Sequence, residues 1–126
     1  MIGNKYIEGL FNYPDEDTSI NELLELLKYK DPNFIDSLKK EDINLDLCTN
    51  DEIKYLTKVS SLIDYYFQIH EFKIPKWIRD ERLQFDMPYY HSKRINDFER
   101  LKLQIESPSP FRRRNVYFEL DSIVWV

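Results

Sequence analysis

A chain of 126 residues is long enough to bury one hydrophobic core and too short for two independent ones. Hydrophobic residues make up 42% of it and charged residues 33%, so the composition predicts a folded domain rather than a disordered one. The net charge is -5, and only two glycines are present, which excludes glycine-rich phosphate loops, dinucleotide fingerprints and nucleophile elbows.

Helix signals follow one another through the first 40 residues. The aromatic residues of 1–18 predict a short docked helix, which an acidic turn at 14–17 follows. Ser19 and Glu22 have the spacing of a capping box, and the apolar period after them predicts a helix at about 20–30. Asp31 before Pro32 then predicts a second helix that ends near residue 40.

The clearest helix signal lies in the middle of the chain. Thr49 and Glu52 form a second capping-box pattern, and apolar residues repeat at a period near 3.6 over about 50–71. Pro75 ends this run, and Trp77 directly after it is expected in the core.

The last third of the chain changes character. Apolar residues from Ser92 onward predict another helix, which the proline-rich stretch 107–110 must end. The segments 116–120 and 123–126 favour β structure and predict a strand pair or an extended tail packed on the helices. We therefore expect a mainly α single domain over residues 1–126, a helical bundle with an extended or short β C-terminal segment. It has an acidic helical front at 1–72 and a back rich in proline, aromatic residues and arginine at 73–126.

The candidate site lies in this back half. All seven arginines of the chain occur there, while every basic residue of 1–63 is lysine. Guanidinium groups bind carboxylates and phosphates through paired hydrogen bonds and stack on aromatic rings. The sequence therefore predicts a partner-binding surface from Arg112, Arg113, Arg114, Phe111, Tyr89 and Tyr90. Three consecutive arginines cannot all face one way in an extended segment, so internal ion pairing with the acidic front stays open as the alternative.

Catalytic and metal-binding patterns are not visible. His70, His91 and the single cysteine Cys48 have no zinc spacing, and the interpretation of Cys48 as a small core residue is preferred to that of a nucleophile. Carboxylates are too numerous for any two to be singled out. We expect no cofactor and no metal, and the single cysteine together with the absence of a long apolar run predicts a cytoplasmic protein outside the membrane.

One resemblance covers roughly residues 62–120. Its residues are the proline–tryptophan element Ile74-Pro75-Lys76-Trp77-Ile78, then Leu83 and Pro88-Tyr89-Tyr90, and the closing segment Glu106-Ser107-Pro108-Ser109-Pro110-Phe111-Arg112-Arg113-Arg114-Asn115-Val116-Tyr117-Phe118. This combination resembles a family of small uncharacterised bacterial proteins that occur in mobile or toxin–antitoxin-like loci. The resemblance implies a shared structural or docking element and no catalytic role.

Together these patterns predict a non-enzymatic protein-interaction protein that is antitoxin-, inhibitor- or adaptor-like. It would bind a partner protein through its C-terminal arginine and aromatic segment. The alternative is a nucleic-acid-binding regulator that uses Arg112 to Arg114 on phosphates. The sequence leaves the partner and the oligomeric state undetermined.

Overall fold

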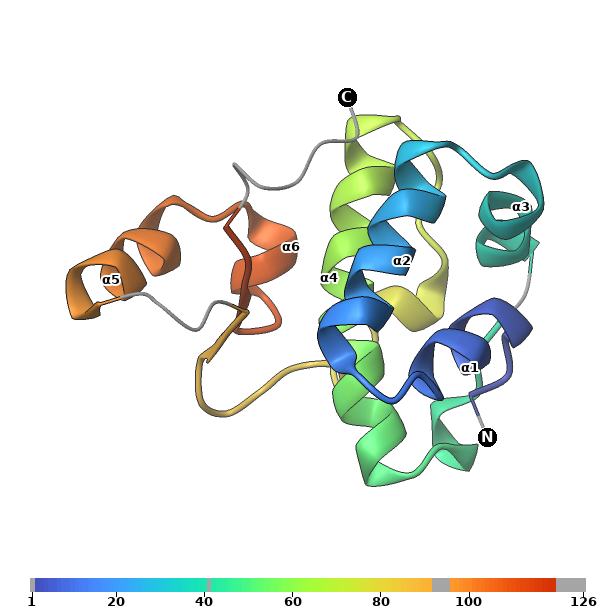
Figure 1. Cartoon of the computed structure of the whole chain (residues 1–126), viewed down its shortest axis with the longest axis horizontal. Helices are drawn as coiled ribbons and strands as arrows, with labels where there is room; N and C mark the ends of the chain where they lie inside the picture. Colours follow the sequence, from blue (N-terminus) through green and yellow to red (C-terminus); the bar gives the residue numbers. More distant parts are fainter. Residues whose placement is uncertain (1, 41, 92–95, 120–126) are drawn as a thin grey trace.

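The longest helix, α4 (Asn50–Ile69), runs through the middle of the molecule, with elements packed on both sides (Figure 1). The structure is a computed structural model that describes residues 2–40, 42–91 and 96–119. On one side of α4 lie α1 (Lys5–Phe11), α2 (Glu16–Lys28) and α3 (Pro32–Lys40), and on the other lie α5 (Asp97–Glu106) and α6 (Ser109–Arg112). The expected mainly α single domain is confirmed.

The capping box predicted for α4 is present. The backbone amide of Glu52 donates to Thr49 Oγ1 at 3.2 Å, and the amide of Thr49 donates to Glu52 Oε1 at 2.9 Å. Two of the first unpaired donors of the helix are thereby satisfied. Because α4 is packed on both sides, its buried side chains surround much of the helix, and the fully buried ones include Leu56, Val59, Leu62, Ile63, Tyr66 and Phe67.

The start predicted for the helix at about 20–30 was wrong. α2 begins at Glu16 and is capped by Asp15, whose carboxylate accepts from the amides of Asp17 and Thr18. Glu16 and Asp17, which were expected in an acidic turn, lie in the first turn of α2, where negative charge is favourable next to the helix N-terminus. Ser19 is therefore no cap: its hydroxyl lies in the core and donates to the carbonyl of Leu10 at 2.7 Å.

The predictions for α3 and for Trp77 agree with the structure. Asp31 caps α3 by accepting from the amide of Phe34 at 3.0 Å, and two lysines end this helix. The short 3-10 helices are η1 (Leu45–Leu47) and η2 (Lys76–Arg79). Trp77 on η2 is buried as predicted.

The back half is held together by a small parallel sheet. Strand β1 (Tyr89–Tyr90) pairs with β2 (Val116–Tyr117), so that Tyr89 lies opposite Val116 and Tyr90 opposite Tyr117. The chain leaves β1, forms α5 and α6, and returns as β2 against α4. The helix predicted from Ser92 onward begins at Asp97, because Asn96 is its N-cap. Residues 92–95 and the predicted β segment 123–126 lie outside the described residues.

None of the helices in the described ranges combines the length and apolar character that a membrane span requires.

Candidate functional site

Three arginines of the back half bind one buried carboxylate of α4. Asp64 lies on α4 and is fully buried. Its Oδ2 is 2.9 Å from Arg114 Nη2 and 3.4 Å from Arg113 Nη1, and its Oδ1 is 3.2 Å from Arg79 Nη2. Gln68, one turn further along α4, donates to the same Oδ1. We call Asp64, Arg79, Arg113 and Arg114 the arginine cluster.

Arg114 is the buried member of the triplet predicted from the sequence. Its Nη1 donates to the carbonyl of Pro110 at 2.7 Å, and its Nη2 donates to the carbonyl of Ile78 as well as to Asp64. Burial lowers the pKa of Arg114 below its usual value, while the Asp64 carboxylate opposes that shift. This side chain thus fastens η2 and the start of α6 onto α4.

Arg79 and Arg113 lie at the edge of the cluster. Their side chains are 42% and 39% exposed, and each reaches Asp64 through one terminal nitrogen. Both line a hollow of about 130 Å³, which we call the arginine hollow. Its other lining residues are Ile78, Asp80, Glu81, Leu83, Gln84 and Arg114.

The remaining predicted residues of this segment divide between core and surface. Phe111 is fully buried and packs against Tyr65 and Phe118, with ring centroids 5.2 and 6.0 Å apart. Arg112 is exposed and forms no ion pair within the described part of the chain. Of the six residues predicted as a binding surface, Phe111 and Arg114 are therefore out of reach of a partner in this structure. Local folding into α6 rather than an extended strand separates the three arginines.

Tyr89 and Tyr90 are half-buried and join neighbouring elements. Lys58 on α4 places its Nζ 4.3 Å from the ring centroid of Tyr89, and burial raises the pKa of that phenol. Tyr90 stacks on Tyr117 with centroids 5.5 Å apart, and its hydroxyl accepts from Gln104 on α5. Their rings are engaged within the protein on at least one face.

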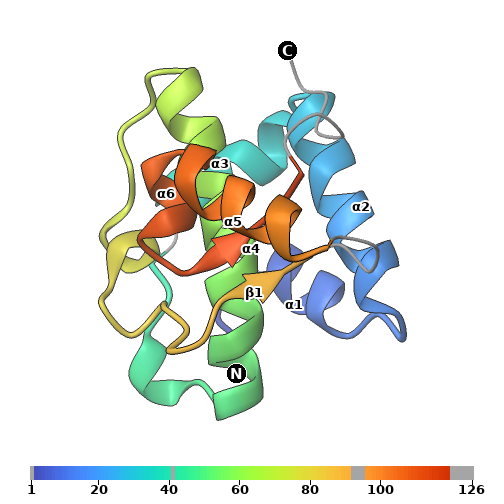
Figure 2. The same ribbon diagram turned by 90° about the vertical axis from the view of Figure 1, so that its left-hand side faces the viewer.

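One face of α5 exposes three large apolar side chains. Phe98, Leu101 and Ile105 are 74%, 55% and 66% exposed. Their spacing of three and four residues places them on the same side of the helix. None of the ten residues of α5 is buried, and Figures 1 and 2 show this helix at the outside, beyond α6 and β1. We call these three side chains the apolar α5 face.

Contacts of the opposite side hold α5 to the sheet. Gln104 donates to the hydroxyl of Tyr90, and the guanidinium of Arg100 lies 5.5 Å from the centroid of the same ring. The amide of Glu99 donates to the side chain of Asn96 at 2.9 Å, which caps the helix. The helix is thus anchored while its apolar side chains are directed away from the core.

Sequence reasoning missed this face, although it predicted the helix. The apolar period of residues 98–105 was the signal, and it identifies a helix side that needs a covering. That period alone does not say whether the covering belongs to the same chain. In the described ranges no element covers it.

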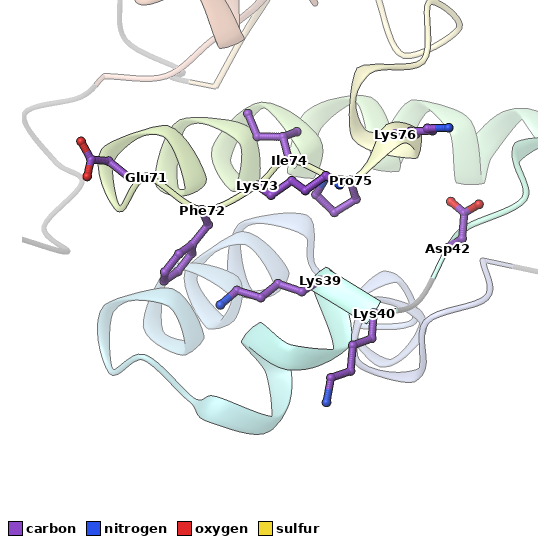
Figure 3. A pocket seen from close by; sticks show the side chains of 9 residues that line it. All are labelled: Lys39, Lys40, Asp42, Glu71, Phe72, Lys73, Ile74, Pro75 and Lys76. Atoms are coloured by element: carbon purple, nitrogen blue, oxygen red, sulfur yellow. The ribbon is translucent and has the colours of Figure 1, made fainter.

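A second hollow of about 600 Å³ lies between α3 and the segment after α4 (Figure 3). It is lined by Lys39, Lys40, Asp42, Glu71, Phe72, Lys73, Ile74, Pro75 and Lys76. Lys39, Lys40 and Lys76 point in different directions, and the Nζ of Lys39 lies 3.8 Å from the ring centroid of Phe72. The ammonium groups do not converge on one point, and Lys39 and Lys40 are favourably placed at a helix C-terminus.

The surroundings of Cys48 and His70 favour a structural role for both side chains. Burial and the nearby Glu52 raise the pKa of the Cys48 thiol, which disfavours the nucleophilic thiolate. The ring of His70 lies 4.2 Å from that of Tyr66, and its Nε2 is buried. Within residues 2–40, 42–91 and 96–119, no three His, Cys, Asp or Glu side chains form a group that could hold a metal ion.

Comparison with protein-family models, with curated proteins and with solved structures gives no match to this chain, so the interpretation of its site depends on the geometry above.

Proposed function

We propose that this chain is a non-enzymatic interaction protein that binds a partner protein through the apolar α5 face. The observation that carries the proposal is a capped helix of ten residues with no buried side chain and three large apolar ones exposed on one side. Exposed apolar surface that is contiguous is typical of interaction sites. An antitoxin-, inhibitor- or adaptor-like role is the specific form that we propose.

The shape of this surface favours a partner with an apolar groove. Phe98, Leu101 and Ile105 form a ridge, and ridges of this spacing bind by inserting an amphipathic helix into a complementary groove. Full burial of each such side chain contributes roughly 1.5 to 3 kcal/mol before the costs of association are subtracted. Three such anchors together contribute roughly 4.5 to 9 kcal/mol, so the polar rim must add further contacts to exceed the costs of association.

The charges beside the ridge favour a protein over a polyanion. The exposed residues of α5 include Asp97 and Glu99 as well as Arg100 and Lys102, so neither sign dominates. Mixed charge at the edge of an apolar patch resembles the rim of a protein interface. The proposed surface thus differs from the one predicted from sequence, because Phe111 and Arg114 contribute to the core that supports it.

The nucleic-acid alternative receives less support. Arg114 is buried, so at most Arg112 and Arg113 of the triplet can reach a phosphate, and Arg113 already uses one nitrogen on Asp64. Phosphate-based binding needs several exposed cations and weakens steeply as salt rises.

Site-specific crosslinking in the native host tests the proposal. A photoreactive amino acid at position 101 is compared with the same group at Leu47, which is 64% exposed on η1 and therefore a matched exposed leucine. We expect one abundant crosslinked protein at position 101 and none at position 47.

Each other outcome contradicts the proposal. Equal crosslinking at both positions would indicate nonspecific contact. A product containing only this chain would assign the face to self-association, and a nucleic-acid product would favour the alternative.

A further inference from the structure

Two guanidinium groups are held side by side at the surface by one buried carboxylate. Arg79 comes from η2 and Arg113 directly follows α6, yet their terminal nitrogens contact the two oxygens of Asp64 at 3.2 and 3.4 Å. Both line the arginine hollow. Because Asp64 is fully buried and fixed on α4, it determines the position of both groups.

Three guanidinium groups and three carboxylates lie in and around this hollow, and two of the carboxylates are already bound by arginines. Three guanidinium groups contact the single carboxylate of Asp64. Asp80 also lines the hollow, but both of its oxygens are bound by Arg82 at 3.1 and 3.0 Å. Glu81 is the remaining acidic residue of the lining.

Arg79 and Arg113 also have N–H donors that make no hydrogen bond within the described residues. A guanidinium group has five N–H donors, and Arg79 and Arg113 each use one nitrogen on Asp64. Burial lowers the pKa of Arg114, and the like charges of Arg113 and Arg79 add to this effect. A bound anion would reduce the repulsion between these like charges and accept the free donors.

The size of the hollow limits what can enter. Its volume of about 130 Å³ compares with the roughly 30 Å³ that one water occupies in the liquid. This space suits a single carboxylate or phosphate group and is too small for a whole nucleotide. The planar fork of a guanidinium matches two oxygens of such a group.

We propose that Arg79 and Arg113 form a binding site for one oxyanionic group, a carboxylate or a phosphate, in the arginine hollow. The site does not depend on the apolar α5 face, because α5 contributes no residue to it. Asp64, which Arg114 also binds, holds the two arginines in place.

Titration of the ¹⁵N-labelled protein with sodium phosphate and, separately, with sodium acetate tests this site by NMR, with sodium chloride holding the ionic strength constant. We expect saturable shifts of the Arg79 and Arg113 side-chain Nε–H signals with at least one of the two anions. The stronger response identifies phosphate or carboxylate as the preferred group.

Neighbouring variants separate a site from general charge effects. Arg79→Gln and Arg113→Gln should each weaken binding at least tenfold, whereas Arg112→Gln, which removes the same charge one residue before Arg113 at a position that does not line the hollow, should change it less than twofold. Amide spectra show whether each variant is folded. If Arg113→Gln does not fold, the result for Arg79→Gln decides the test. Linear, non-saturating shifts, or an equal loss in Arg112→Gln, would overturn the proposal.

Discussion

Replacing Arg114 with methionine removes the buried cation that joins η2 and α6 to α4. The methionine fills much of the volume but donates no hydrogen bond. The carbonyls of Pro110 and Ile78 then lose their donor inside the core, and Asp64 keeps Gln68 and the two half-exposed arginines. The variant therefore tests whether Arg114 has a structural role or belongs to a binding surface.

The expected loss is large for a single substitution. Each buried carbonyl that loses its donor costs about 1 to 3 kcal/mol. Removal of one partner from a buried ion pair typically costs about 3 to 5 kcal/mol. Relaxation lets water or Arg113 recover part of this sum, so we expect Arg114→Met to lower the free energy of unfolding by about 3 to 5 kcal/mol. A typical domain has only about 5 to 15 kcal/mol in total.

Urea unfolding followed by circular dichroism measures this difference. The matched control is Arg112→Met, which makes the same chemical change two residues earlier at an exposed position and should stay within about 0.5 kcal/mol of the unmodified protein. A cost below about 1 kcal/mol for Arg114→Met, or equal costs for the two variants, would refute the assignment of Arg114 to the core.

Three further predictions concern stability. Burial lowers the pKa of His70 below 6.5, so the unfolded state binds a proton more readily than the folded state. We therefore expect the free energy of unfolding to fall as pH falls through 6.5. His70→Phe should reduce this pH dependence in urea titrations at several pH values. Burial raises the pKa of Tyr55 to about 12, so its phenolate should appear in an ultraviolet titration only near that pH; Tyr55→Phe, which removes the contact with Ser19, should cost about 1 kcal/mol in urea unfolding, and an unchanged titration curve would contradict the assignment. Thr49→Ala removes the acceptor for the Glu52 amide and should destabilise the protein by about 1 kcal/mol in thermal unfolding, whereas no change in Tm would mean that the cap is dispensable.

Local signals were sufficient for most helices and failed where two of them competed. Thr49 and Glu52 stood alone before a long apolar period, and α4 begins where they predict. Before α2, however, Asp15 and Ser19 are both good N-cap residues. Asp15 caps the helix, because the Ser19 hydroxyl lies in the core and donates to the carbonyl of Leu10. That requirement is tertiary and has no local signature.

The arginine cluster depended on distant contacts and was not predictable in detail. Arg114 and Asp64 are 50 positions apart, and no nearby pattern marks Asp64 among the many carboxylates of the chain. The sequence did show that three adjacent arginines would not share one direction. It could not say which of them would be buried, because that depends on the turn that α6 makes.

For α5 the sequence predicted the helix but not the exposure of its apolar face. Periodicity correctly predicted a helix with an apolar side, and the usual interpretation is that such a side packs into the core of its own domain. The pairing of β1 with β2 turns α5 outward instead, since Tyr90 and Gln104 anchor its other side. This arrangement follows from contacts between residues far apart in the chain, so the helix could be predicted and its exposure could not.

The central claim is that the apolar α5 face binds a partner protein. The most direct test is the affinity of the crosslinked partner, once purified, for Leu101→Ser and for the matched Leu47→Ser, measured by titration calorimetry. Loss of at least tenfold in affinity with Leu101→Ser, with Leu47→Ser within twofold of the unmodified chain, is the predicted result. Equal affinities for the two variants in folded protein would contradict the claim.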